Sequence, residues 1–371
     1  MDVPRLRLAA HHLTGGGLPT PAGVVRHLGA LQAQDYGQCL WAVGSRLRTP
    51  RVSAVEAAIA AGEIVRSWPM RGTIHLVPPG DLRWMLALCA GRKVAADARR
   101  MAQLELTEAD VDRAAELVGA AFAEAAPGPL SRAALLAALE AGGLSTAGQR
   151  GYHLLWRLAQ AALICLGPQQ GSTQTFAWLD DWVPRATSLD LDRDAALTRL
   201  ATRFALSRGP VTAHDLARWA GLTVTDARRG LAAATAESCD AAPLVEGELG
   251  GRPVWFAEPG PARRGWRAPL LLAGFDEYLI GYAGRDKILN PAFADRIVPG
   301  GNGVYRPMLV EGGRITGVWR RTLSAKALTV EVFPFAAGTP ATERAVEAAA
   351  QRYLRFLEQP EKVALSVRFP G

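Results

Sequence analysis

Two glutamines, Gln32 and Gln34, are separated by one alanine in the segment LGALQAQDYG, residues 29–38. Amide carbonyl oxygens accept hydrogen bonds, so two that face one point can hold a water molecule and stabilise developing positive charge. Residues two apart point about 200° apart on a helix, whereas in extended backbone they share a face. Joint action therefore requires that the segment has left helical geometry, which the following Asp35-Tyr36-Gly37 supports. The alternative is that both glutamines cap the preceding helix or bind water.

Other catalytic patterns are missing from the sequence. The glycine-rich segment 300–303 has no following Lys-Ser/Thr and therefore does not form a Walker loop, and there is no G-x-S-x-G motif. The adjacent His11 and His12 lack a nearby third ligand. The four cysteines are far apart and are expected to be buried, reduced thiols: Cys39, Cys89, Cys165 and Cys239. We therefore expect neither a metal nor a cofactor.

Two carboxylates, Asp276 and Glu277, interrupt the apolar run GFDEYLIGY. A charge in such surroundings needs a partner, because an unpaired buried charge is costly. We expect a salt bridge to Arg285 or Arg267.

Length and charge set limits on the class of protein. The chain has 371 residues, 49% of them hydrophobic, which is enough for two or three core-forming units. Its net charge of +7 favours a polyanionic partner, although composition alone makes many arginine-rich chains basic. No apolar run is long enough to span a membrane, and no apolar segment follows the first arginines. We expect a cytoplasmic monomer.

Three segments share one plan of helix, short turn, helix and strand pair: residues 20–78, 129–179 and 209–257. In the third, Thr212 is a candidate N-cap, Gly221 a turn and Gly250-Gly251 the tip of a strand pair. Candidate helix starts in the other two segments are Thr20, Ser53 and Ser131. Helix, glycine turn and helix followed by a β-ribbon is typical of a winged helix. The alternative for each segment is a simple helical hairpin with a ribbon.

The C-terminal part changes character. Residues 268–336 alternate like strands and predict a small antiparallel sheet or barrel, and a last helix is expected from Thr342 to Glu358. The predicted fold class is thus mainly α with β wings (α+β), with three tandem winged-helix units and a C-terminal β-rich region. The expected domains are residues 1–125, 126–207, 208–262 and 263–371.

Four segments together resemble the bacterial AlkZ/YcaQ-type DNA glycosylases: LGALQAQDYGQCLWAVGSRL, RGTIHLVPPGDLRWML, LLLAGFDEYLIGY and MLVEGGRITGVWRR. The resemblance covers nearly the whole chain. It implies tandem winged helices around a concave channel that holds duplex DNA. It also implies a monofunctional glycosylase that releases N7-alkylated purines and unhooks azinomycin-type interstrand crosslinks, which gives self-resistance and DNA repair.

The resemblance also assigns residues. Gln32 and Gln34 form the Gln-x-Gln signature and would hold the hydrolytic water beneath C1′, with Gln34 as the main positioning residue. The neighbouring carboxylate of Asp35 is expected to assist, although the family pattern does not require it. A hairpin at residues 310–318 would enter the minor groove. The residues expected to contact DNA are Arg46, Arg71, His75, Gly312, Gly313, Arg314, Arg320 and Arg321. Solvated surface arginines, and a histidine packed within its strand, are the alternatives.

The rival function is a non-enzymatic winged-helix DNA-binding protein such as a transcriptional regulator, and an architectural protein is a third possibility. A regulator needs a dimer matched to a palindromic site, or an effector pocket. The sequence offers no heptad zipper, and the three recognition-like helices differ. The expected partner is double-stranded DNA with alkylated or crosslinked purines, on which this cytoplasmic protein would associate with the nucleoid.

Overall fold

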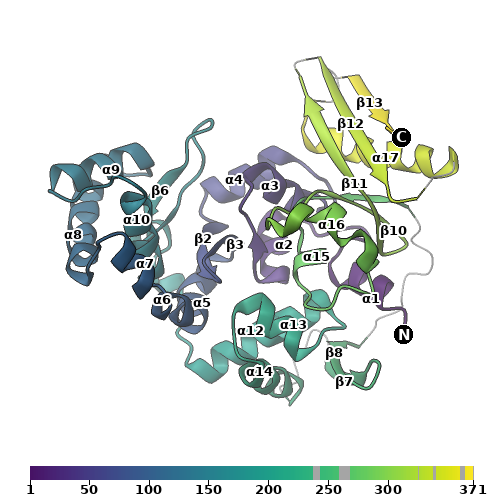
Figure 1. Ribbon diagram of the computed structural model, residues 1–371, viewed down its shortest axis with the longest axis horizontal. Coiled ribbons are helices and arrows are strands. Elements are labelled where there is room, and N and C mark those ends of the chain that lie inside the picture. Colours follow the sequence, from purple (N-terminus) through teal and green to yellow (C-terminus); the bar gives the residue numbers. More distant parts are fainter. Residues whose placement is uncertain (237–242, 259–267, 325, 337–339, 360–363, 371) are drawn as a thin grey trace. The chain divides into compact units, whose positions relative to one another are not determined.

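The computed structural model describes residues 1–236, 243–258, 268–324, 326–336, 340–359 and 364–370 (Figure 1). The chain forms two compact units. The first unit comprises Met1–Val55 and Leu197–Gly371, and the second comprises Glu56–Ala196. The four-domain division of the sequence stays a prediction. Among the described residues, no helix combines the length and the apolar character that a membrane span requires.

The second unit contains five strands in the order β3-β2-β5-β6-β4. They are β2 (Val65–Met70), β3 (Thr73–Val77), β4 (Leu130–Ser131), β5 (Ile164–Leu166) and β6 (Thr175–Trp178). The helices that begin in this unit are α5 (Leu82–Cys89), α6 (Gly91–Ala95), α7 (Ala98–Gln103), α8 (Glu108–Glu124), α9 (Arg132–Ala141), α10 (Arg150–Gln160), α11 (Leu179–Trp182) and α12 (Arg193–Arg208). The apolar faces of α7, α8, α9 and α10 form one core with β2, β5 and β6, around Leu135, Leu139 and Leu154, each fully buried.

A two-residue turn joins β2 and β3. Arg71 and Gly72 both have positive φ, 56° and 71°, and Met70 pairs with Thr73 across the turn. Two consecutive positive φ values are typical of a type I′ turn, which matches the twist of antiparallel strands. The hairpin predicted here from the sequence is confirmed.

One order of elements recurs along the chain: helix, short strand or bridge, two helices, then a strand pair. In the second unit it is α8, β4, α9, α10, β5 and β6. It recurs as α12, the bridge Val211–Trp255, α13 (Ala213–Ala220), α14 (Val224–Ala236), β7 (Leu244–Glu248) and β8 (Pro253–Ala257). The same order appears in α2 (Pro21–Leu28), β1 (Leu31–Gln32), α3 (Tyr36–Gly44), α4 (Val52–Ala60), β2 and β3. The helix and hairpin elements expected for these segments are therefore present.

Predicted N-caps begin three of these helices. Side-chain oxygens of Thr20, Ser131 and Thr212 accept hydrogen bonds from the backbone N–H three residues on, at 3.1, 3.1 and 3.2 Å. Such caps stabilise a helix because they satisfy N–H groups that have no partner within it. The cap expected at Ser53 is wrong, since α4 already begins at Val52 and the Ser53 N–H donates to Glu358.

The C-terminal region forms a five-stranded sheet in the order β13-β12-β11-β10-β9. Its strands are β9 (Leu270–Leu272), β10 (Met308–Glu311), β11 (Arg314–Leu323), β12 (Ala327–Pro334) and β13 (Ala364–Arg368). The sheet is open, so the barrel alternative is not observed, and β13 runs parallel to β12 rather than antiparallel. Helix α17 (Pro340–Phe356) lies against the sheet, where Tyr353 meets the ring of Trp319 at 5.2 Å (Figure 1).

The first unit also contains α1 (Val3–Ala10), α15 (Glu277–Ile280) and α16 (Ala294–Ile297), and short 3₁₀ turns occur in both units at Pro79–Asp81, Arg185–Thr187, Pro291–Phe293 and Pro299–Gly301. Helix α1 supports the turn between β10 and β11. Gly312 and Gly313 form this turn with φ of 56° and 83°. The Gly313 carbonyl accepts a hydrogen bond from the Tyr278 hydroxyl at 2.6 Å. A Cβ at Gly313 would lie 2.7 Å from the Pro4 side chain, whereas nothing lies within 4 Å of one at Gly312.

This difference predicts unequal costs for two neighbouring alanine substitutions. Gly312→Ala should lower the free energy of unfolding by about 1–2 kcal/mol, the cost of placing an L-residue at positive φ. Gly313→Ala should lose about 1–3 kcal/mol more, because its methyl group must also displace Pro4. Urea unfolding of both variants measures the two losses, and equal losses would contradict the packing of the turn against α1.

Candidate active site

The Gln-Ala-Gln segment is not helical: it begins in a two-residue strand, and Gln34 lies in a bend before the next helix. Helix α2 ends at Leu28, and Gly29 closes it with φ 74°. Strand β1 then contains Gln32, and α3 begins at Tyr36. Residues 31–34 alternate between inside and outside: Leu31 and Ala33 are buried, Gln32 is half-buried and Gln34 is exposed. Both glutamines therefore lie on one face of the segment, which is the geometry that joint action requires.

A buried carboxylate holds the first glutamine. The Gln32 backbone N–H donates to Glu277 Oε1 at 3.0 Å. The other oxygen, Oε2, accepts from Arg208 Nη2 at 2.8 Å and from Trp219 Nε1 at 2.7 Å. Glu277 is 1% exposed, and the three donors compensate the cost of removing its charge from water.

Arg208 extends this support to the residues before the motif. Its Nη1 donates to the Leu28 carbonyl at 2.8 Å, and its Nη2 donates to the Ala30 carbonyl at 3.0 Å. The guanidinium is completely buried. One arginine and one glutamate thus fix the backbone from the end of α2 to Gln32.

A second buried ion pair lies next to the first along the chain. Arg46 donates to both oxygens of Asp276, at 2.9 and 2.7 Å, and both side chains are inaccessible to solvent. Asp276 also caps α15 by accepting the Tyr278 N–H at 2.8 Å. Paired charges at residues 276 and 277 are thus confirmed.

The partners of these carboxylates differ from those predicted. Arg285 donates instead to the Leu279 carbonyl and the Tyr305 hydroxyl, and Arg267 lies outside the described residues. The pairing with Arg46 also corrects its assignment as a phosphate contact. A guanidinium with no exposed surface and a bidentate carboxylate partner does not reach DNA.

His11 connects the two ion pairs. Arg46 Nη2 lies 3.3 Å from His11 Nδ1, which must accept because a guanidinium only donates. The proton is therefore on Nε2, which donates to the Tyr282 hydroxyl at 3.0 Å, and Tyr282 donates to the Arg208 carbonyl at 2.8 Å. Burial, and next the charge of Arg46, hold the pKa of His11 well below its usual range. His11 is thus a neutral part of the scaffold.

Asp35 begins the helix that follows the motif. It is exposed, and its carboxylate accepts the Gln38 N–H at 3.0 Å as the N-cap of α3. The Gln38 side chain in turn accepts the Gly274 N–H at 2.7 Å, which ties α3 to the loop before Asp276. The structure therefore fixes Asp35 next to Gln34, and its role as an assistant stays a prediction.

Arg321 is a predicted DNA contact that lies beside the helix following the motif. A Cβ on Gly37 would be 3.5 Å from Arg321 Nη2 and 3.6 Å from Asp35 Oδ1, so these groups surround the first turn of α3. The guanidinium also lies over the Tyr353 ring, 5.6 Å from its centroid. A hollow of about 390 Å³ adjoins it, lined by Gln38, Pro307, Trp319, Arg320, Arg321 and Leu323.

The sequence of the chain matches the family model of the AlkZ-like DNA glycosylases over residues 25–356. The chain belongs to this family. An interstrand DNA crosslink repair glycosylase of Streptomyces sahachiroi is 25% identical over 325 residues, 85% of each chain. The solved structure of the Streptomyces sahachiroi DNA glycosylase AlkZ has the same fold, with a TM-score of 0.79 at 23% identity over 99% of this chain and 98% of that one.

Two other predicted contacts of this AlkZ-like glycosylase are in the second unit. His75 is completely buried: its Nδ1 pairs with the Thr73 carbonyl at 2.8 Å, and its Nε2 lies 3.2 Å from Arg71 Nη2. The assignment of His75 to DNA binding is therefore wrong, and the alternative of a packed strand histidine is correct. Arg71 itself is half-buried at the turn and stays a candidate.

The expected groove-entering hairpin, residues 310–318, is not an exposed probe. Val310, Gly313 and Ile315 are buried, and Gly313 packs against Pro4. Gly312 and Arg314 are exposed beside the turn. The next turn, between β11 and β12, is flanked by exposed residues instead: Thr322, Leu323, Ser324 and Lys326. The sequence points to the first turn because it contains two adjacent glycines. One of them, Gly313, is needed partly because a side chain at this position would collide with Pro4 of α1.

The arginines of β11 have different surroundings. Arg320 is exposed and makes two hydrogen bonds to Glu331 on β12, at 2.7 and 3.0 Å. Arg321 faces α3, as described above.

Among the described residues, no group of three or more histidine, cysteine, aspartate or glutamate side chains is arranged to hold a metal ion.

Removal of the carboxylate beneath Gln32 should be far more damaging than removal of one in a surface pair. Glu277→Ala leaves Arg208 buried without its partner, and we expect a loss of about 3–5 kcal/mol in the free energy of unfolding. The matched control, Glu331→Ala, breaks a pair with the exposed Arg320, in which the Glu331 side chain is 18% exposed, and should change stability very little. Urea unfolding compares the two, and a small loss for Glu277→Ala would show that this pair does not support the site.

Acid should weaken the first unit through its histidines. Burial lowers the pKa of His27 to about 4, despite its hydrogen bond to the Ala10 carbonyl, and also lowers the pKa of His12. Such groups stabilise the folded state fully above pH 6.5, their unfolded value, and less as pH falls, because only the unfolded chain then binds their protons.

We therefore expect unfolding free energies to decrease from pH 7 to pH 5, by up to about 1.4 kcal/mol per pH unit for each histidine that stays neutral. Urea titrations across this range measure the slope. The variant His27→Gln takes up one proton fewer when it unfolds, so its unfolding free energy should change less steeply with pH. An unchanged slope would contradict the lowered pKa of His27.

Proposed function

We propose that this AlkZ-like glycosylase is monofunctional, hydrolyses the N-glycosidic bond of N7-alkylated purines and unhooks interstrand crosslinks of the azinomycin type. Its role would be self-resistance and DNA repair. The observation that carries the proposal is the shared outward face of Gln32 and Gln34 on a non-helical segment that buried ion pairs fix in place. The relative from Streptomyces sahachiroi, described as an interstrand crosslink repair glycosylase, supports the substrate class.

The chemistry suits neutral amides. Alkylation at N7 makes guanine cationic, so the base can leave with its bonding electrons without protonation by a strong general acid. The remaining tasks are to place a water molecule beneath C1′ and to stabilise an oxocarbenium-like sugar. Glutamine carbonyl oxygens accept hydrogen bonds from the water and direct the negative ends of their dipoles toward the developing charge.

Gln34 is the more exposed amide and is the main water-positioning residue in this proposal. Gln32, held by Glu277 through its backbone, supplies the second acceptor. Glutamine is a weak base, so the proton leaves the water late in the reaction. Asp35 is the neighbouring carboxylate that can take it, and its capping bond to Gln38 keeps it beside Gln34.

An exposed catalytic residue also fits a bulky lesion. A crosslinked base is tethered to both strands and is not easily rotated out of the duplex into a deep pocket. Gln34 is exposed rather than enclosed, so a water held there can reach a lesion that remains in the duplex. We infer that the lesion is read from the groove.

The DNA-binding part of the proposal rests on the recurring order of elements. We infer that the three segments are winged helices and that they line a concave channel for duplex DNA. The exposed or half-buried arginines that remain as phosphate contacts are Arg71, Arg314, Arg320 and Arg321. A transcriptional regulator of the winged-helix class is the second candidate, and the same recurring elements are what favour it.

Base release from a defined duplex tests the proposal. The substrate is an oligonucleotide duplex with one N7-methylguanine, and free base is measured by mass spectrometry under single-turnover conditions. Gln34→Ala should slow release by about 10²–10³-fold, the usual cost of one preorganised group, and Gln32→Ala by somewhat less. The exposed glutamine of α7 provides the control, and Gln103→Ala should release base at the normal rate.

The outcomes separate the candidates. Release that survives the double substitution of Gln32 and Gln34 would remove both residues from the mechanism. Absence of release from every alkylated duplex, with DNA binding intact, would favour the regulator. A crosslinked duplex in the same assay tests unhooking directly.

A further inference from the structure

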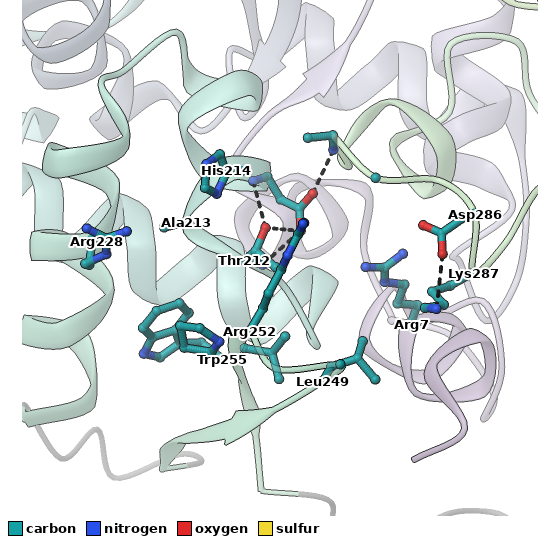
Figure 2. A pocket seen from close by; sticks show the side chains of 16 residues that line it. Arg7, Thr212, Ala213, His214, Arg228, Leu249, Arg252, Trp255, Asp286 and Lys287 are labelled. Atoms are coloured by element: carbon teal, nitrogen blue, oxygen red, sulfur yellow. Dashed lines mark hydrogen bonds and ion pairs between the residues drawn. The ribbon is translucent and has the colours of Figure 1, made fainter.

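A cavity of about 1000 Å³ lies in the first unit, apart from the residues of the Gln-x-Gln motif (Figure 2). Its walls come from the start of α13, from α14, from the turn between β7 and β8, from α1 and from residues 283–287. The functions assigned above use none of these side chains. The charges and hydrogen bonds of the lining side chains therefore indicate which ligand this cavity binds.

Positive charge predominates in the lining. Four cationic side chains, Arg7, Arg228, Arg252 and Lys287, face two carboxylates, which leaves a formal excess of +2. Both carboxylates are already engaged. Asp215 accepts the N–H groups of Thr212 and Ala283, at 2.8 and 2.7 Å.

The second carboxylate, Asp286, forms an ion pair with Lys287 at 3.1 Å. By contrast, Arg228 and Arg252 are exposed, and neither side chain makes an ion pair or hydrogen bond with any residue that the structure describes. Two guanidinium groups are thus available to an outside anion.

The start of α13 adds to the positive potential. Thr212 is the N-cap, and the N–H groups of Ala213 and His214 have no acceptor within the helix. The helix dipole places partial positive charge at this end, which favours anions such as phosphate. Figure 2 shows Thr212 and His214 beside Arg252 at the wall of the cavity.

Arg7 supplies an independent indication of a ligand. Its side chain is 4% exposed, its Nε and Nη2 both donate to the Pro210 carbonyl at 3.2 Å, and its guanidinium lies 3.6 Å from the centroid of the Tyr282 ring. Its Nη1 is buried and has no hydrogen-bond partner among the described residues. Buried donors are rarely left without an acceptor. In Figure 2 the guanidinium extends from α1 toward the cavity.

The turn between β7 and β8 places one of the available cations. Gly250 and Gly251 have φ of 60° and 72°, and Leu249 and Arg252 exchange backbone hydrogen bonds at 2.9 and 3.3 Å. This is a tight two-residue hairpin, so Arg252 has a fixed place at its tip. Arg228 reaches the cavity from α14, a separate element.

We propose that this cavity binds backbone phosphates of the DNA duplex on which the glycosylase acts. The inference rests on the proposed function. Cationic side chains from α1, α14, the hairpin and residue 287 surround this cavity. Charges spread over separate elements match a run of phosphates along a strand better than one small anion. These contacts carry no sequence information and add affinity for any duplex.

The test compares a double variant of the cavity with a control at the arginine next to Arg228 on α14. The variant Arg228→Ala/Arg252→Ala removes both available cations of the cavity. The control, Arg229→Ala, removes an exposed arginine that does not line the cavity and lies 3.8 Å from Asp226. Binding of a fluorescein-labelled plain duplex and of the same duplex with one N7-methylguanine is measured by anisotropy over a series of KCl concentrations.

The double variant should bind both duplexes about tenfold more weakly, and its slope of log K against log[KCl] should be shallower by about 0.9 for each phosphate that the protein no longer neutralises. At subsaturating DNA its single-turnover base release should fall in parallel with the loss of affinity, since less enzyme is then bound to the duplex. The control should match the wild type in both measurements. Circular dichroism verifies that each variant is folded.

Unchanged affinity, or weaker binding with an unchanged salt slope, would overturn the proposal. So would a weaker affinity for the lesion duplex alone. Inorganic pyrophosphate is the probe for the other source of phosphate. If it raises the melting temperature of the wild type but not of the double variant, while DNA binding is the same for both, the cavity takes a small phosphorylated molecule instead.

Failure of the proposed function has a different signature. In that case the wild type binds DNA through Arg228 and Arg252 but releases no base from any alkylated duplex. The two inferences therefore succeed or fail on separate measurements.

Discussion

The buried carboxylates of residues 276 and 277 are the constraint on which the candidate site depends. Each pairs with an arginine from a different part of the first unit: Asp276 with Arg46, and Glu277 with Arg208. Two ions in an apolar interior are tolerated only when every partner is in place, so the elements that carry them are fixed relative to one another. Because the Gln32 backbone N–H is one of the donors to Glu277, the same ion pairs also fix the position of the motif.

The charged groups and the amides of the motif thus lie at different depths in the protein. The ionised groups lie inside, where they position the backbone, and uncharged amides face outward, where they would meet the substrate in the proposed reaction. A cationic leaving group would make this division workable, because that reaction needs an oriented water more than it needs a strong acid. Preorganised dipoles cost no reorganisation during the reaction, and the ion pairs beneath β1 are what preorganise Gln32.

Local features were predictable from the sequence, and distant partners were not. The end of the helix before the motif, the caps at Thr20 and Thr212, and the glycine turns follow from neighbouring residues. Arg46 and Asp276 are 230 positions apart, so nothing local distinguishes this buried arginine from a surface one. The burial of His75 and the packing of Gly313 against Pro4 were missed for the same reason: both depend on which surfaces meet after folding.

Helix α13 would connect the proposed DNA contact with the support of the motif. Its first residues line the basic cavity, and Trp219, near its end, donates to Glu277 beneath Gln32. The capping box of Thr212 and Asp215 fixes the start of this helix, and Asp215 also binds the Ala283 N–H, so α13 is tied at both ends to residues 277–283. One short rigid element therefore relates the place where a phosphate would bind to the carboxylate that positions the catalytic segment. A duplex held at the cavity would meet a motif whose position relative to that cavity is already set, which is the preorganisation that a site for bulky lesions requires.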